Sequence, residues 1–286
     1  MKHLLLFGAG LALTLSQSIK ASELKTLDGH FHQKRLEALE KMDPNIISPL
    51  RSAYRDVANK SSGEDRIKAG ARMGRLYIFE GDYLIPANNK KRRKALFEDC
   101  IKDADLIKPG NGVRENQPYY YVKLACLTYK SAAGSLSDKL EAKSYFGGDK
   151  DLFFRGIKVG SEYQGGGILR IASGIMTNPL ARLVGLYKPN EALQYSNDAL
   201  DAGPHWIDEA GLYGDVYCDN YRYKSLAYKV QGKNTEARAV IEEAIDTFEI
   251  NFSDSGVTSI GYLPETQTPE TKACANRLFK IWRDLQ

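Results

Sequence analysis

The most regular pattern of apolar and polar positions in this chain runs over Asp219–Phe248. Tyr221 is followed seven residues later by Tyr228 and, four residues after that, by Gly232, as expected on one face of a helix that ends at a glycine. Small and apolar residues then recur at helical spacing: Ala237, Ile241 and Ala244. The pattern predicts two helices joined by a tight turn, and the alanines allow them to pack closely.

Other segments repeat parts of this pattern. Arg72–Gly81 and Lys90–Lys108 predict two helices joined by a longer loop, and Tyr119–Gly134 and Asn190–Ala202 place small and aromatic residues at similar gaps. The chain resembles the tetratricopeptide repeat family, in about four degenerate copies over residues 64–250. This resemblance implies an all-α fold, an α-solenoid of helical hairpins. A chance likeness among ordinary amphipathic helices is the alternative.

The segments around the repeats complete the predicted architecture. Helices are expected near residues 33–42 and 46–59, and Pro269–Leu285 carries an apolar stripe typical of a C-terminal capping helix. Asn251–Thr268 is polar and contains glycine and proline, so we expect a long loop there and no sheet. The predicted divisions are a signal peptide (1–21), an N-terminal arm with helices (22–63) and a helical-repeat domain (64–286).

The first residues show the three regions of a secretory signal peptide. A basic start with Lys2 precedes the apolar run Leu4–Leu15, and Ala21 offers a small residue for cleavage. This run of 12 residues is too short to span a bilayer, which takes about 20. We therefore expect a chain exported to the periplasm or beyond, with no membrane span after cleavage. A buried N-terminal helix is the alternative.

All four cysteines follow the predicted cleavage site. An even number in an exported chain suggests disulfides, and no pair has the Cys-x-x-Cys spacing of redox or zinc motifs. Four cysteines allow three pairings, and the sequence alone does not choose between them. If neighbouring repeats stack, the favoured pairs are Cys100–Cys126 and Cys218–Cys274.

The net charge and the absence of known catalytic motifs indicate which classes of function to expect. The formal net charge of +4 is close to balance and gives no reason to expect nucleic acid or an anionic membrane as the main partner. The sequence has no His-Glu-x-x-His, no Gly-x-Ser-x-Gly and no phosphate-binding Gly-x-x-x-x-Gly-Lys-Ser/Thr. Acidic residues are scattered, without an evident catalytic pair. We therefore predict binding rather than catalysis, with no cofactor and no metal.

Two chemical alternatives stay open. An enzyme could use Arg170 with carboxylates such as Glu162. Asp28, His30 and His32 could share a metal if this segment is an extended arm, because residues two apart then project on the same side. The simpler interpretation of these three residues is a solvated arm.

The most unusual stretch contains three successive glycines, Gly165, Gly166 and Gly167, directly before a predicted helix that carries Arg170. Accessible amides at a helix start favour an anion, and an arginine can grip a carboxylate with two hydrogen bonds. These four residues are candidate ligand-binding positions. A turn that only permits close backbone approach is the alternative.

Tyrosine is abundant, with 17 residues in the chain. Tyr213, Tyr217, Tyr221 and Tyr228 fall at gaps of four and seven, roughly on one helical stripe. We expect Tyr213, Tyr217 and Tyr221 to line a concave ligand-binding wall with hydrated hydroxyl groups. Burial in the core between repeats is the alternative.

The glycine-rich stretch also resembles the T component associated with tripartite ATP-independent periplasmic (TRAP) transporters. The resemblance covers roughly residues 160–250, and the matching residues are Gly165, Gly166, Gly167, Arg170, Pro179, Glu191–Tyr195, Ala199 and Pro204. It implies an exported helical protein that partners a periplasmic solute-binding protein and holds a small apolar or organic-acid ligand. A generic repeat scaffold for envelope assembly, without a small ligand, is the alternative function.

Overall fold

The computed structural model describes residues 4–110, 112–146, 151–202, 217–263 and 268–286, with side chains from residue 22 onward. Its helices are α1 (Leu4–Lys41), α2 (Ser48–Lys60), α3 (Gly63–Phe79), α4 (Lys90–Ala104), α5 (Gln117–Ala133), α6 (Leu136–Lys143), α7 (Leu152–Val159), α8 (Gly167–Met176), α9 (Pro189–Ala202), α10 (Cys218–Lys229), α11 (Asn234–Phe248) and α12 (Thr268–Asp284). Short helical turns are η1 (Pro44–Ile46), η2 (Glu80–Leu84), η3 (Asp105–Ile107) and η4 (Pro179–Val184), and the strands are β1 (Ile250–Ser253) and β2 (Gly256–Ile260). Most of the described chain is helical, as predicted.

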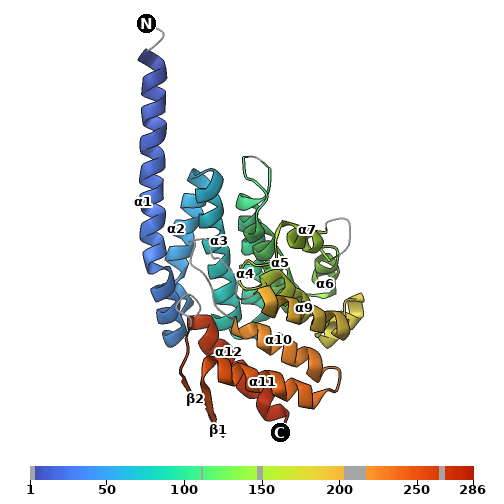
Figure 1. The fold of residues 1–286 in the computed structure, drawn as a ribbon. Coiled ribbons are helices and arrows are strands. Elements are labelled where there is room, and N and C mark those ends of the chain that lie inside the picture. Colours follow the sequence, from blue (N-terminus) through green and yellow to red (C-terminus); the bar gives the residue numbers. More distant parts are fainter. Residues whose placement is uncertain (1–3, 111, 147–150, 203–216, 264–267) are drawn as a thin grey trace.

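Helices that follow one another in the chain pack in pairs: α2 with α3, α4 with α5, α8 with α9, and α10 with α11 (Figure 1). The hairpin predicted over residues 219–248 is confirmed as α10 and α11. They are joined through Gly232, whose φ of 76° suits glycine far better than other residues. A large apolar core lies between the first five helices and α7 and α8, and it includes Tyr54, Phe97 and Phe153.

Helix α12 contacts more elements than the single neighbour that a terminal capping helix would cover. It packs on α10, on α1 and on β2. Arg277 Nη1 lies 2.9 Å from Asp82 Oδ2 in η2, and Glu270 pairs with Arg35 in α1. In a linear solenoid each unit contacts only its neighbours. Here α12 contacts elements from both halves of the sequence, so the helix stack closes on itself.

Both favoured disulfide pairings are confirmed. The Cα atoms of Cys100 in α4 and Cys126 in α5 are 6.1 Å apart. The same distance separates the Cα atoms of Cys218, which begins α10, and Cys274 in α12. The first disulfide joins the two helices of one pair, and the second fixes α12 against α10.

Residues 250–260 form a β-hairpin where we expected only a loop over 251–268. β1 and β2 are antiparallel, with Phe252 opposite Val257. Phe252 packs on Phe279 and Trp282 of α12, with ring centroids 5.2 and 5.5 Å apart. Strands of four and five residues are too short for a sustained alternating pattern, and a lone hairpin is stable only when it packs on another element.

The N-terminal arm is helical rather than extended. Asp28, His30 and His32 lie within α1, where residues two apart point about 200° apart around the axis. Asp28 accepts hydrogen bonds from Tyr54 Oη at 2.7 Å and from Arg72 Nε at 3.1 Å. The expectation that both histidines share one side with Asp28 is therefore wrong. The described residues hold no group of three or more His, Cys, Asp or Glu side chains placed to bind a metal ion.

The N-terminal part of α1 extends beyond the body of the molecule (Figure 1). Leu24 and Phe31 are buried against the body, and both follow the predicted cleavage site after Ala21. No helix in the described ranges combines the length and the apolar character that crossing a membrane requires. Cleavage and export stay predictions.

Candidate functional site

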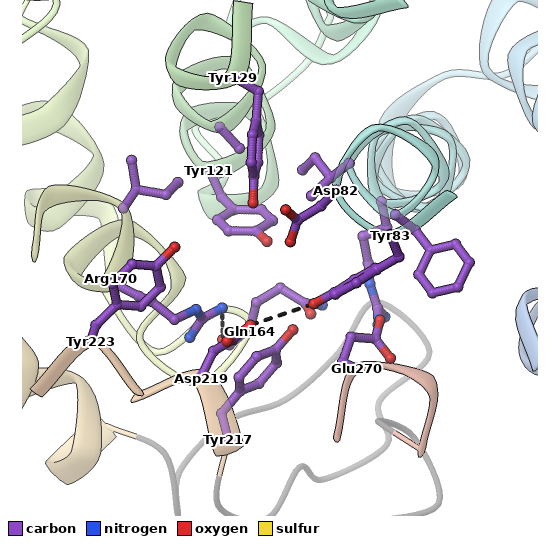
Figure 2. Close-up of a pocket in the computed structure, with 15 residues that line it drawn as sticks. Asp82, Tyr83, Tyr121, Tyr129, Gln164, Arg170, Tyr217, Asp219, Tyr223 and Glu270 are labelled. Atoms are coloured by element: carbon purple, nitrogen blue, oxygen red, sulfur yellow. Dashed lines mark hydrogen bonds and ion pairs between the residues drawn. The ribbon is translucent and has the colours of Figure 1, made fainter. Parts of the chain in front are cut away.

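A cavity lies where α3 and η2, α5, the turn before α8, the start of α10 and α12 meet (Figure 2). Its volume is about 50 Å³, which leaves room for a few water molecules or a small polar group. The polar lining consists of Arg75, Asp82, Tyr83, Tyr121, Tyr129, Gln164, Arg170, Tyr217, Asp219, Tyr223 and Glu270. We call this space the central cavity.

The π-helical turn η2 places two of these side chains. Helix α3 runs directly into it, and Gly81, which we expected to end the helix, lies inside the turn. A Cβ at Gly81 would sit 2.1 Å from the ring of Phe97, so the missing side chain lets α4 approach. The turn directs Asp82 and Tyr83 into the cavity (Figure 2). Such π-helical turns occur frequently at functional sites.

Tyrosine hydroxyls supply much of the polar surface of the central cavity. Burial raises the pKa values of Tyr83, Tyr121, Tyr129 and Tyr217 above the usual range. These phenols therefore stay protonated at neutral pH, and each one can both donate and accept a hydrogen bond. A lining of this kind recognises polar groups without adding charge.

Each of the three cavity carboxylates has an arginine partner: Asp82 with Arg277, Asp219 with Arg222, and Glu270 with Arg35. Burial alone would raise the pKa of Asp219, but the charges of Arg222, Arg277 and Arg170 lower it. Asp219 is therefore ionised at neutral pH and accepts hydrogen bonds rather than supplying a proton. Glu162, named in the enzyme alternative, accepts a hydrogen bond from Gln117 Nε2 at 3.0 Å and is not among the lining residues.

Arg170 holds the glycine-rich turn and faces the cavity. Its Nη1 donates to the carbonyl oxygen of Gly165 and to Asn220 Oδ1, both at 2.9 Å, and its Nη2 donates to the carbonyl oxygen of Gln164 at 3.0 Å. The guanidinium lies over the ring of Tyr217, 3.9 Å from its centroid. Among the described residues no carboxylate lies within ion-pair distance of Arg170. Its direct partners are therefore neutral acceptors and a ring face, while the charge of Asp219 acts on it from beyond ion-pair distance.

Gln164 combines three features at the centre of the cavity. Its side chain is 1% exposed, its Nε2 has no hydrogen-bond partner among the described residues, and its backbone φ is 57°. A buried amide left without a partner costs about 1–3 kcal/mol, and non-glycine residues rarely adopt positive φ. Strain and an unpaired donor at the same position are typical of a binding site rather than of core packing.

The three glycines support the cavity from outside. Gly166 has a φ of 79°, and a Cβ there would lie 2.6 Å from Ala199 Cα, so only glycine fits this turn against α9. Cβ atoms at Gly165 and Gly167 would lie 3.0 Å and 2.6 Å from Tyr217 and Tyr121. The turn thus brings the carbonyl groups before α8 within reach of Arg170 and holds two cavity tyrosines closely. Anion binding by these glycines stays a prediction.

The three predicted tyrosines are placed differently from one another. Tyr217 lines the central cavity. Tyr221 is buried against Phe248, and its hydroxyl lies 3.4 Å from Thr247 Oγ1, within the core between α10 and α11. Tyr213 lies outside the described residues. The sequence analysis missed the other four tyrosines and Gln164; the one available signal was a polar residue directly before three glycines.

A second, larger pocket adjoins the first. It lies between α5, α6, α8 and η4, its volume is about 260 Å³, and its lining is mainly apolar. Four residues line both pockets: Ala125, Tyr129, Ile171 and Tyr223. We call this second space the apolar chamber. The two pockets therefore share a wall, polar on one side and apolar on the other.

Comparison with protein-family models, with curated proteins and with solved structures finds no match for this chain. The function of this chain is therefore inferred from the geometry of the site and from the sequence resemblance of residues 160–250.

Proposed function

We propose that this chain is an exported binding protein that holds a small organic acid in its central cavity. The observation that carries the proposal is Gln164, a strained and buried residue whose amide nitrogen has no hydrogen-bond partner in the described part of the chain. A ligand oxygen that accepts a hydrogen bond from Nε2 would remove the cost of leaving this donor unpaired.

The charges around the cavity favour an acidic ligand. The three lining carboxylates are paired with arginines, whereas the direct contacts of Arg170 are neutral acceptors and the Tyr217 ring, with Asp219 acting on it only from beyond ion-pair distance. A carboxylate near Gln164 would lie in the field of this buried cation, and the tyrosine hydroxyls would donate to its oxygens. Glu270 Oε2 also lacks a hydrogen-bond partner among the described residues, and it could accept from a hydroxyl or amino group of the ligand.

The proposed role is that of an accessory to TRAP-type solute uptake, with a periplasmic solute-binding protein as partner. The resemblance of residues 160–250 to the T component supports this role. Within that stretch, the Gly165–Gly167 turn and Arg170 build one side of the cavity. The mature, oxidised chain would receive the ligand from its partner or pass it on.

Ligand binding can be tested with purified chain. Native mass spectrometry and isothermal calorimetry against a panel of small mono- and dicarboxylates are expected to identify at least one ligand. The Gln164→Met variant removes the unpaired amide without removing a described protein hydrogen bond. It should fold normally and bind about 10–100-fold more weakly, the loss expected for one hydrogen bond to a charged group. Tyr221→Phe, a buried change outside the cavity, should bind like the parent chain.

Two outcomes would contradict this function. The first is that no acid binds and none copurifies. The second is that an acid binds equally well to the parent chain and to Gln164→Met. Association with a solute-binding protein is tested separately, by pull-down with the solute-binding protein encoded beside a TRAP transporter.

An envelope-assembly scaffold without a small ligand is the second candidate. Exposed leucines on α6 and η4 favour it, because side chains such as Leu136, Leu140, Leu180 and Leu183 are each more than half exposed. A partner protein that is captured equally by the parent chain and by Gln164→Met, without any bound acid, would support the scaffold instead.

A further inference from the structure

The two pockets have part of their lining in common. Tyr129 and Tyr223 contribute to both linings, as do Ala125 and Ile171. A Cβ at Gly174 would lie 2.7 Å from Cε1 of Tyr223, so the absence of a side chain there lets the Tyr223 ring lie against α8. A ligand that passes between the two tyrosine rings would occupy both spaces.

The central cavity has a polar lining and the apolar chamber has an apolar one. The two spaces therefore match the polar head and the apolar tail of an amphiphilic molecule. The central cavity offers the Gln164 amide, Arg170 and tyrosine hydroxyls within about 50 Å³. The apolar chamber offers about 260 Å³ lined by residues such as Ile175, Ala181 and Val184. A preformed apolar space beside a few convergent polar groups is the usual form of a small-molecule site.

We infer that the ligand is an aliphatic carboxylic acid whose carboxylate lies in the central cavity and whose alkyl tail fills the apolar chamber. This inference rests on the proposed function and assigns its ligand class. The chamber has an outer rim at Leu180 on η4, which lines the chamber although its side chain is 55% exposed. The acid enters over this rim with its carboxylate first, and the carboxylate passes the two tyrosines toward Arg170 while the tail stays in the chamber.

A homologous series tests the role of the chamber. Binding of acetate, butyrate, hexanoate, octanoate and decanoate is measured by calorimetry with the full, oxidised chain. Affinity should rise about threefold to fourfold for each methylene that enters the chamber and then level off once the chamber is full. Octanol, which has the same tail and no charge, should bind at least tenfold more weakly than octanoate.

A matched pair of variants locates the tail. Leu180→Asp and Leu183→Asp both change exposed leucines of η4, but only Leu180 lines the chamber. Leu180→Asp should weaken octanoate binding about tenfold or more and leave acetate binding unchanged. Leu183→Asp should leave both unchanged. Both positions are exposed, so both variants should keep the melting temperature of the parent chain.

The outcomes separate this inference from the proposed function. If short acids bind and chain length has no effect, or if Leu180→Asp behaves as Leu183→Asp, the inference is overturned and the proposed function stands. If octanol binds as tightly as octanoate, the placement of the carboxylate is wrong. If no acid of any length binds, both this inference and the proposed function are wrong.

Discussion

The guanidinium of Arg35 in α1 forms a buried ion pair with the carboxylate of Glu270 in α12, across 235 residues of sequence. The face of the Phe31 ring lies against the same guanidinium, 4.4 Å from its central carbon. Burial lowers the pKa of Arg35 to about 10, which still leaves the charge in place at neutral pH. This pair joins α1 to the helix that carries one wall of the central cavity.

Removing one partner of this pair should destabilise the fold strongly. Arg35→Met leaves the Glu270 carboxylate buried with less compensation, and we expect a loss of about 3–5 kcal/mol in the free energy of unfolding. Denaturant titration measures it. Arg155→Ala, which removes an exposed ion pair with Glu115, should cost about 1 kcal/mol or less. Equal effects of the two substitutions would show that the buried pair has no special importance.

The disulfide between Cys218 and Cys274 should contribute more stability than the one between Cys100 and Cys126. Loop-closure entropy gives about 4 kcal/mol for a separation of 56 residues and about 3.5 kcal/mol for 26. Paired Cys→Ser variants, compared by denaturant titration without reductant, test this order. Alkylation followed by mass spectrometry should detect free thiols in the parent chain only after reduction. A free thiol in the oxidised chain would contradict the pairing.

Two helical glycines should respond oppositely to alanine. At Gly74 a Cβ would lie 2.5 Å from two carbon atoms of Val122, where α3 crosses α5, so Gly74→Ala should destabilise the fold by about 1–3 kcal/mol. At Gly29 in α1 a Cβ would meet no atom within 4 Å, so Gly29→Ala should stabilise by up to about 1 kcal/mol through helix propensity. Thermal melts of both variants give the signs, and a stabilised Gly74→Ala would refute the close crossing of α3 and α5.

Asp138 should make stability fall in acid. Burial would raise its pKa, but hydrogen bonds from Lys94 and Ser135 outweigh burial and lower it. An aspartate whose pKa is lowered by folding contributes its full stabilisation above the ordinary pKa value near 4. This contribution is lost as the pH falls toward the pKa of the folded state. Asp138→Asn should therefore lower the free energy of unfolding by about 1–3 kcal/mol at neutral pH. Below about pH 4, the stability of the variant should fall less steeply than that of the parent chain. If the free energy of unfolding had the same pH dependence in the parent chain and in Asp138→Asn, this role would be contradicted.

The helices could be predicted because their periodicity is local. The hairpin over residues 219–248 and the helix after Pro269 follow from spacing that neighbouring residues supply. The β-hairpin could not be predicted, since its strands depend on Phe252 packing against α12, a contact that spacing along the chain does not reveal.

The candidate site could be predicted only in part. Arg170 and Tyr217 were expected on local grounds, and both line the central cavity. The tyrosine stripe assumed one continuous helix, but α10 begins at Cys218, so Tyr217 has extended backbone and faces a different way from Tyr221. Asp82 and Glu270 come from elements that meet only when α12 closes on η2, so no local pattern could join them.

The position of Glu270 also sets an order of events. Every other element of the central cavity precedes α12 in the chain. When the N-terminus emerges first, α12 is therefore the last of these elements to appear, and the cavity is incomplete until α12 docks. The Cys218–Cys274 bond then locks that docking, and it forms only where the surroundings are oxidising. A chain that crosses a membrane in the unfolded state would therefore complete the central cavity only after the crossing.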